Sequence, residues 1–264
     1  DESMGIFRPV TLISTPDVMI KDLFVKPVVD PSDLSSADLE ISAVLVNLSD
    51  RPVRGCFTGR YEDRTFESEV ELAAGESRKL TVTEHVDDPR IWWSRDLGIP
   101  EMYRLDVDFR TDAGISAKSS TGFGIRSITS EIDEYGHRQF ILNGRKVLLK
   151  SAGWTDHIFM QDTRGNLESQ IAYVCDMGLN SIRFENIWGK DHTVYDLCDS
   201  LGLMAMVGWS CQWEWEDYCG LPETDGYGCI NDPESEALAI RYFRDQVLWL
   251  RNHPSVIAWL TGSD

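Results

Sequence analysis

The chain has 264 residues, with 44 Asp or Glu against 25 Lys or Arg, and its formal net charge at pH 7 is -19. This charge argues against a nucleic-acid partner, because few cations are available to displace phosphate counterions. No apolar run reaches the roughly 20 residues that span a bilayer, so no membrane partner is predicted. The first residue is Asp1 and not an initiator Met, so the lack of a signal peptide says little about location.

The six cysteines predict neither a metal site nor an antibody-type disulfide. They form no pair at CxxC spacing and no short cluster with histidine, and no motif implies a cofactor. Cys175 and Cys198 fall on apolar helix faces and are predicted to be core thiols. Cys211, Cys219 and Cys229 share one loop region, where a disulfide can form but cannot be paired from the sequence.

Residues 1 to about 126 are predicted to be all-β. Apolar and polar residues alternate at period two, and turn residues separate the segments 39–47, 65–72, 78–83 and 103–109. Short strands at this spacing predict a β-sandwich of immunoglobulin type, although Cys56 has no partner cysteine in this half. We interpret this half as a packing or spacer module, because the fold alone confers no activity.

Near residue 127 the hydrophobic period changes. We expect a hairpin at 140–144, a strand at 146–150, and then helices and strands in alternation: helices 167–177, 193–201 and 233–251, and strands 179–184, 203–208 and a last one from Val256. The last helix is predicted to begin at Pro233, with Asp232 as N-cap, and to turn Ile240, Phe243, Val247 and Leu250 inward. This alternation predicts a parallel sheet with right-handed crossovers.

Four strands with three helices make half of a (β/α)8 barrel. Because a half-barrel leaves two open sheet edges, we expect the chain to be a fragment of a longer polypeptide or to be completed by a second chain. Polar residues follow each predicted strand: Gly153–His157, Arg183–Asn186, Trp209–Asp217 and Ser263–Asp264. Barrel enzymes carry their active sites at this end of the strands.

Each of these residues also has an ordinary structural explanation. Taken alone, Asp264 could be a polar strand end or a helix cap. Arg183 follows an apolar strand, and a partly buried guanidinium requires a carboxylate, which Glu185 could supply. Trp249 and Trp259 are predicted to be core residues, because large aromatic side chains are usually buried.

Several motifs, taken in order, resemble glycoside hydrolase family 2 in its exo-β-D-glucosaminidase-like branch. They are Ile91-Trp-Trp-Ser94, Phe123-Gly-Ile-Arg126, Leu142–Lys150, Gly178-Leu-Asn-Ser-Ile-Arg183, Gly208-Trp-Ser-Cys211 and Asn252-His-Pro-Ser255. The resemblance implies three parts. Residues 1–9 would end an N-terminal sugar-binding domain, residues 10–126 would form the immunoglobulin-like sandwich, and residues 127–264 would form the barrel half, truncated after strand 4.

The resemblance also implies roles for single residues. Most of the family ends its fourth strand in Asn-Glu, whereas this chain has Ser263-Asp264, as in the glucosaminidase branch, where Asp is the general acid/base. A 2-ammonium group has three donors and no acceptor, so an amide NH₂ pointing at it would be repelled, and a small Ser suits it better. Glu216 and Asp156 would hold the amine, although His157 could take the place of Asp156.

Arg183 resembles the arginine that keeps the family's nucleophile ionised, and Glu185 and Trp209 complete the expected substrate-binding set. The nucleophile itself comes from the seventh strand in this family and is not in this sequence, so we expect the 264-residue piece to be inactive alone.

The implied reaction is the retaining hydrolysis of a terminal β-linked sugar, glucosamine, from oligosaccharides. One alternative is a β-mannosidase or β-galactosidase of the same family that acts on a neutral sugar. A second is a non-catalytic carbohydrate-binding remnant. The expected partners are a carbohydrate substrate and the rest of the barrel. We expect a periplasmic or extracellular location, because polymeric sugars lie outside the cell.

Overall fold

The computed structural model describes residues 10–155, 162–185, 191–208 and 232–261. Contacts divide the chain into two compact units. One holds Val10–Trp93 and Ile99–Val147, and the other joins Ser94–Gly98 to the described residues from Leu148 onward. No helix of the described residues is both long and apolar enough to cross a membrane. The predicted boundary between residues 126 and 127 remains a prediction.

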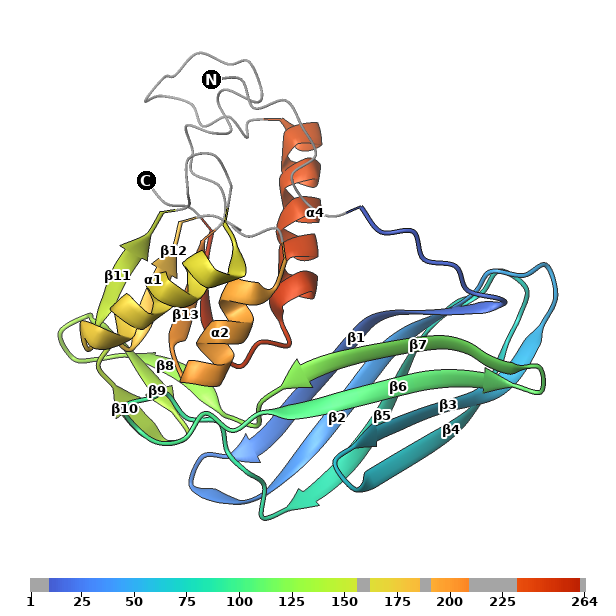
Figure 1. Cartoon of the computed structure of the whole chain (residues 1–264), viewed down its shortest axis with the longest axis horizontal. Helices are drawn as coiled ribbons and strands as arrows, with labels where there is room; N and C mark the ends of the chain where they lie inside the picture. Colours follow the sequence, from blue (N-terminus) through green and yellow to red (C-terminus); the bar gives the residue numbers. More distant parts are fainter. Residues whose placement is uncertain (1–9, 156–161, 186–190, 209–231, 262–264) are drawn as a thin grey trace. The chain divides into compact units, whose positions relative to one another are not determined.

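The first unit contains a β-sandwich of two antiparallel sheets (Figure 1). One sheet has the order β1-β2-β5, with β1 Val18–Asp30, β2 Asp33–Asn47 and β5 Ser77–Asp87. The other has the order β4-β3-β6-β7, with β4 Arg64–Leu72, β3 Val53–Tyr61, β6 Tyr103–Thr111 and β7 Gly114–Phe123. The four predicted strand segments lie inside β2, β4, β5 and β6 and are confirmed.

Strict alternation explains why these strands pair into a sandwich. In β6, Tyr103, Leu105, Val107 and Phe109 are buried in the core, whereas the residues between them are more exposed. Side chains of successive strand residues point to opposite faces, so each sheet has one apolar face. The two apolar faces share a single core cluster.

A three-stranded antiparallel sheet follows in the same unit, with β8 Ile128–Ile132, β9 Arg138–Leu142 and β10 Arg145–Val147. The expected hairpin is confirmed: Asn143 and Gly144 connect β9 to β10 with φ of 49° and 77°. Positive φ at both positions is the requirement of a tight two-residue hairpin turn, and Asn-Gly meets it. The predicted strand 146–150 is wrong, because Arg145–Val147 pairs antiparallel with β9.

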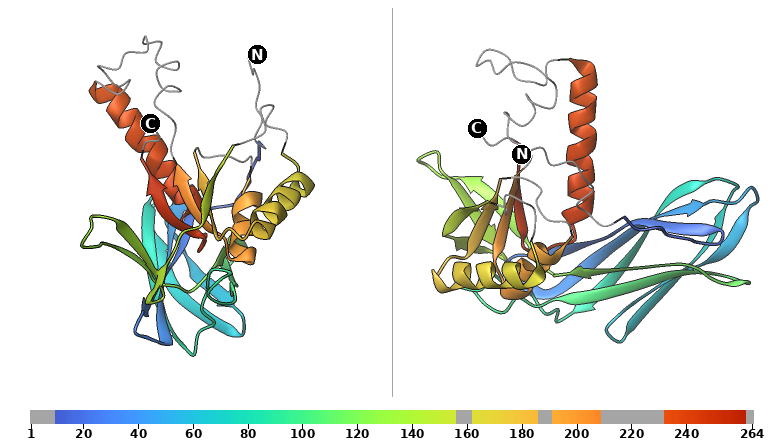
Figure 2. Two further views of the ribbon diagram at one scale, coloured as in Figure 1. Left: turned by 90° about the vertical axis from the view of Figure 1, so that its left-hand side faces the viewer. Right: turned by 45° about the horizontal axis from the view of Figure 1, so that its top comes forward.

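The second unit contains a parallel sheet of four strands in chain order (Figure 2). The strands are β11 Ser151–Trp154, β12 Ser181–Phe184, β13 Met204–Gly208 and β14 Val256–Leu260. The helices α1 Arg164–Asp176, α2 Thr193–Leu201 and α4 Pro233–Leu250 connect them. The predicted alternation of helix and strand is therefore confirmed, with the first strand at 151–154 instead of 146–150.

The helices α1 and α4 begin at side-chain caps. Thr163 accepts a hydrogen bond from the N–H of Asn166 at the start of α1. Asp232 accepts from the N–H groups of Glu234 and Ser235 at the start of α4, as predicted for this N-cap followed by Pro233. Caps of this kind satisfy donors that have no partner within the helix.

The three helices of the described residues, α1, α2 and α4, contribute to one apolar cluster with the sheet. The predicted inner face of α1 is confirmed for Leu167, Ile171 and Val174, which are buried, and Cys175 is partly buried beside them. Cys198 on α2 is a buried thiol, as predicted, and burial raises its pKa well above the ordinary value.

The predicted inner face of α4 is partly wrong. Ile240 is 61% exposed, whereas Ala239, Gln246 and Leu250 are buried. The face of α4 that is buried includes the polar Gln246, whereas the prediction had placed only apolar residues on the buried face. Trp249 and Trp259 are partly buried against the apolar cluster, in agreement with their predicted core positions.

A β-bulge interrupts the pairing of the last strand with β13. Val256 pairs with Ala205 and Ala258 pairs with Met206, so Ile257 is the extra residue. Because of this extra residue, Val256 and Trp259 both pack against the helix-side cluster although they are three positions apart.

Candidate active site

The four parallel strands bring their carboxyl ends to one edge of the sheet. Phe184 of β12 pairs with Trp154 of β11 and with Val207 of β13, which in turn pairs with Trp259 of β14. Each chain segment that leaves this edge contains predicted site residues. In (β/α)8 barrels this edge carries the active site.

Arg183 lies on the face of the sheet that points away from the helices. Its neighbours in β12, Ile182 and Phe184, are buried in the helix-side cluster, and side chains alternate along a strand. Arg183 pairs with Gly153 of β11 and with Met206 of β13, and it is partly buried. The guanidinium is therefore on the side that forms the interior when such a sheet closes into a barrel.

Glu185 follows directly after β12 and is partly buried. Arg183 has an interaction partner in the structure, and its pairing with Glu185, the structural explanation considered for both residues, remains a prediction. The backbone of Glu185 lies close to the end of β13. A Cβ atom built on Gly208 would be 2.2 Å from the carbonyl oxygen of Glu185.

The other predicted site residues lie outside the described residues. These are Asp156, Trp209, Glu216, Ser263 and Asp264, together with the alternative His157 and the loop cysteines Cys211, Cys219 and Cys229. Their predicted roles remain predictions, as do the roles of Arg183 and Glu185.

Sequence reasoning missed a buried chain of polar groups between α2 and the residues before β14. His192 Nδ1 is 2.8 Å from His253 Nε2, and His253 Nδ1 is 2.7 Å from Asp199 Oδ2. The second oxygen of Asp199 accepts the N–H of Ser255 at 3.0 Å. The only sequence signal was the Asn252-His-Pro-Ser255 motif, and it gave no hint of the partners.

Asp196, Asp199 and His253 also place ligand atoms within 4.8 Å of one another, close enough for a metal ion. Asp199 and the Nδ1 atom of His253 are already joined by the short hydrogen bond described above. We therefore interpret the group as a hydrogen-bonded cluster and not as a metal site.

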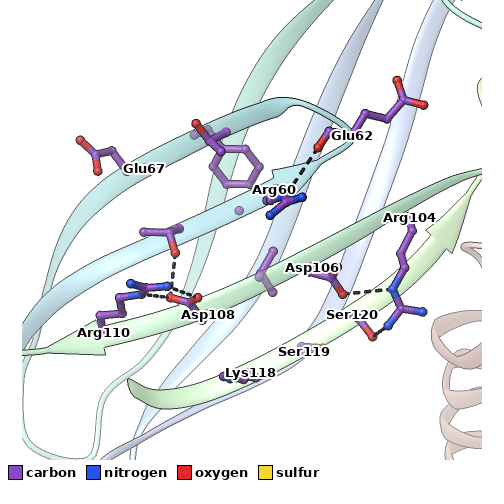
Figure 3. Close-up of a pocket in the computed structure, with 15 residues that line it drawn as sticks. Arg60, Glu62, Glu67, Arg104, Asp106, Asp108, Arg110, Lys118, Ser119 and Ser120 are labelled. Atoms are coloured by element: carbon purple, nitrogen blue, oxygen red, sulfur yellow. Dashed lines mark hydrogen bonds and ion pairs between the residues drawn. The ribbon is translucent and has the colours of Figure 1, made fainter. Parts of the chain in front are cut away.

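A hollow of about 1290 Å³ lies on the outer face of the sandwich sheet that contains β6 (Figure 3). Two of its arginines are paired with aspartates of the same sheet. Arg110 donates to Asp108 at 2.7 Å, and Arg104 donates to Asp106 at 3.1 Å. The hydrogen bond from Arg110 above all, and that from Thr58, lower the pKa of Asp108 despite its partial burial. Four basic and four acidic residues line the hollow, so its formal net charge favours neither an anionic nor a cationic ligand.

A sandwich followed by parallel βα units, with polar residues expected at the carboxyl ends of the strands, is the organisation of a (β/α)8 barrel preceded by an accessory module. Residues 18–126 match the family model of glycosyl hydrolases family 2, and residues 134–264 match the model of its TIM barrel domain. The chain belongs to glycosyl hydrolases family 2, so the family and the fold class predicted from the motifs are confirmed.

Relatives of known activity cover the whole chain. The exo-β-D-glucosaminidase of Streptomyces avermitilis is 32% identical over 272 residues, which are 100% of this chain and 29% of that protein. A solved complex of the exo-chitosanase CsxA of Amycolatopsis orientalis with PNP-β-D-glucosamine matches with a TM-score of 0.85. Its identity is 26%, over 93% of this chain and 28% of that one.

A β-galactosidase of Lactococcus lactis is 28% identical over 272 residues, which are 98% of this chain and 24% of that protein. The chain thus spans less than a third of the length of each of these three proteins.

Proposed function

We propose that this chain is the sandwich and the first half of the catalytic barrel of a retaining exo-β-D-glucosaminidase. The observation that carries the proposal is the common edge of β11 to β14. Asp156 comes soon after β11, Glu185 after β12, Trp209 and Glu216 after β13, and Ser263 and Asp264 after β14. Similarity to the Streptomyces enzyme over the whole of this chain, which corresponds to 29% of that enzyme, supports the choice of substrate.

In the proposed reaction, protonated Asp264 gives its proton to the glycosidic oxygen. A second carboxylate, about 5–5.5 Å away and supplied by the rest of the protein, attacks the anomeric carbon. Asp264 then removes a proton from water, which hydrolyses the glycosyl intermediate. Arg183, on the interior face of the sheet, would keep the attacking carboxylate ionised and oriented.

The proposed selectivity for an amino sugar rests on acidic residues. Glu216 and Asp156 would accept hydrogen bonds from the 2-ammonium group, which has donors only. A charge-assisted hydrogen bond of this kind is about twice as strong as a neutral one. The small Ser263 leaves room for the ammonium group where most of the family has an amide. The expected location outside the cytoplasm remains a prediction.

The test uses the complete protein and nitrophenyl β-glycosides of glucosamine, galactose and mannose. The proposal expects the glucosaminide to have the highest kcat/KM, and Glu216→Gln to lower this preference while activity on neutral sugars changes less. Asp264→Ala should abolish hydrolysis of a natural oligosaccharide. Highest activity on a neutral sugar would favour the β-galactosidase alternative, to which the lactococcal relative points.

The remaining alternative is a carbohydrate-binding protein without catalysis. Trapping with a 5-fluoro glucosaminyl fluoride, which keeps the 2-amino group, distinguishes the two, because only a retaining enzyme forms a covalent glycosyl intermediate. Mass spectrometry of the complete protein should show the added sugar. Sugar binding with no turnover and no adduct would contradict the proposed activity.

A further inference from the structure

Gln246 occupies a position on α4 that packing alone does not explain. It lies on the face of the helix that carries Ala239 and Leu250, and it is only 3% exposed. Its Nε2 atom donates a buried hydrogen bond of 2.8 Å to the carbonyl oxygen of Gly208. Its Oε1 atom is buried and has no hydrogen-bond partner in the described part of the chain.

An unpaired buried acceptor destabilises a helix–sheet interface. A methionine or leucine has a similar volume and would fill the same space without this penalty. The glutamine therefore fits its position best if the hydrogen bond to Gly208 serves a purpose of its own. That purpose must concern the end of β13, since Gly208 is its last residue.

The backbone at the end of β13 is also in close contact with the backbone at the end of β12. A Cβ atom on Gly208 would lie 2.2 Å from the carbonyl oxygen of Glu185 and 2.5 Å from that of Phe184. These are backbone atoms, which cannot swing aside as a side chain can. Gly208 is thus in contact with the neighbouring strand end on one side and is bound by Gln246 on another.

We propose that Gln246 is a positioning residue that fixes the carboxyl ends of β13 and β12 against each other. The proposal deepens the proposed function and rests on it, because these two ends carry Arg183 and Glu185 and lead directly into the segment with Trp209 and Glu216. The hydrogen bond that Gln246 makes is to the main chain and not to a predicted site residue. It acts through the backbone of Gly208.

A small displacement at this edge has a large effect on catalysis. The rate of a catalysed reaction can fall about a hundredfold when a group that orients the substrate is misplaced by 1 Å. The hydrogen bond of Gln246 therefore matters more for the reaction than for the stability of α4, which also packs through Leu250. This difference separates a positioning role from a structural one.

The first experiment compares two variants of the complete protein. Gln246→Met removes the donor and keeps the volume, and Leu167→Ala on α1 weakens the same apolar cluster without touching Gly208. Leu167→Ala should lower Tm, whereas Gln246→Met loses one hydrogen bond but also removes the unpaired acceptor, so its Tm should change less. At a temperature where both are folded, kcat/KM should fall roughly tenfold or more in Gln246→Met and stay near the wild-type value in Leu167→Ala. An unchanged kcat/KM in Gln246→Met would overturn the proposal.

The second experiment uses Gln246→Glu and also decides the question if Gln246→Met fails to fold. The introduced carboxyl group can donate to the carbonyl of Gly208 only when it is protonated. Because it is buried, its proton is lost at a higher pH than usual. The ratio of variant to wild-type kcat/KM should therefore rise as the pH falls, and a constant ratio would contradict the positioning role.

The two experiments use whichever nitrophenyl β-glycoside the wild-type protein hydrolyses best. If that substrate carries a neutral sugar, the proposed glucosaminidase activity fails, but the comparison of variants still tests Gln246. If the glucosaminide is best and both variants behave like the wild type, the positioning role alone fails.

Discussion

His192 and His253 share a hydrogen bond of 2.8 Å between Nδ1 of the first and Nε2 of the second, and Asp199 holds the far nitrogen of His253. Only one proton can occupy each of these links. With both rings neutral, His253 donates to Asp199 and His192 donates to His253. Protonating both rings places two N–H groups against each other and breaks the link between them.

This cluster predicts a loss of stability on acidification. Burial lowers the pKa of His192, and the nearby His253 lowers it further, whereas Asp191 and Asp199 act in the opposite direction. The unfolded chain, whose histidine titrates near pH 6.5, therefore takes up this proton more readily than the folded chain. The stabilisation is fully present above about pH 6.5 and is lost as the pH falls from there towards the lower pKa of the folded state.

Urea unfolding between pH 8 and pH 5 measures this effect. One proton contributes a slope of at most about 1.4 kcal/mol per pH unit. His192→Gln keeps a donor for His253 but cannot titrate, so it should flatten the slope below pH 6.5. His137→Gln changes a histidine with a 77% exposed side chain in the other unit and serves as the control. The same slope in His192→Gln and in the wild type would show that another group is responsible.

Arg183 predicts a change in the pH profile of the complete protein. If this arginine keeps the attacking carboxylate ionised, its removal lets the pKa of that carboxylate rise, by about 1 to 3 units for a close pair. Arg183→Gln should then shift the acidic limb of the kcat/KM profile to higher pH and lower its maximum. Arg183→Lys keeps a charge but not the planar fork, so its acidic limb should move less. A lower rate with an unmoved acidic limb would argue for a role in substrate binding.

The helices and strands could be predicted from local patterns where one physical rule dominates. The helix 193–201 was predicted with the bounds of α2, because its apolar residues are regularly spaced and Gly202 ends it with φ of 67°. The N-cap at Asp232 was predicted for the same reason: a cap is a local hydrogen bond. The family could be recognised because its motifs occur in order along the chain.

The predictions were wrong where contacts between residues far apart in the sequence determine the structure. The apolar run around Leu148 looked like a buried strand, but Leu148 is 79% exposed, since Val147 ends β10 and β11 begins only at Ser151. Ile240 was assigned to the inner face of α4 because the sequence cannot show that Gln246 binds Gly208. Of the predicted site, only Arg183 and Glu185 lie in the described residues, so most of it is tested by experiment alone.

Substitution of alanine for two glycines of the parallel sheet should have different effects on the free energy of unfolding. In Gly208→Ala the added methyl group meets backbone oxygens of Phe184 and Glu185 at 2.5 and 2.2 Å, so the two strand ends must separate. Overpacking of this kind costs about 1–3 kcal/mol. A Cβ on Gly153 meets nothing within 4 Å, and Gly153 has no positive φ. Gly153→Ala should therefore leave the free energy of unfolding within about 1 kcal/mol of the wild type.

Chemical unfolding of the 264-residue chain compares these variants directly. A second readout is hydrogen exchange of the amides in β12 and β13, which should speed up only in Gly208→Ala if the strand ends separate. Equal stability of the two variants would mean that the sheet relaxes around Gly208 without loss of packing.

The last prediction concerns Asn180, the buried residue directly before β12. Its side-chain nitrogen donates to Asp96 Oδ2 at 2.7 Å and to the carbonyl of Leu148 at 2.9 Å, and its oxygen accepts the N–H of Lys150 at 2.8 Å. It thus ties the chain before β11 and the segment Ser94–Gly98 to the parallel sheet. Asn180→Ala leaves these groups without their partner and should cost about 2–4 kcal/mol in the free energy of unfolding.

Asn180→Ala removes both the hydrogen bonds and part of the side-chain volume. Asn180→Asp separates the two effects, because it keeps the volume and removes only the donor. At neutral pH the new carboxylate faces Asp96 and the carbonyl of Leu148 with no donor, so this variant should be less stable than Asn180→Ala, although it keeps the size of the side chain. As the pH falls and the introduced carboxyl group takes up a proton, it can donate again and the difference should close. Asn166→Asp, at an exposed position in the first turn of α1, is the matched control and should change stability little at either pH. If Asn180→Asp is as stable as the wild type at pH 7, the side chain makes no essential donation at this position.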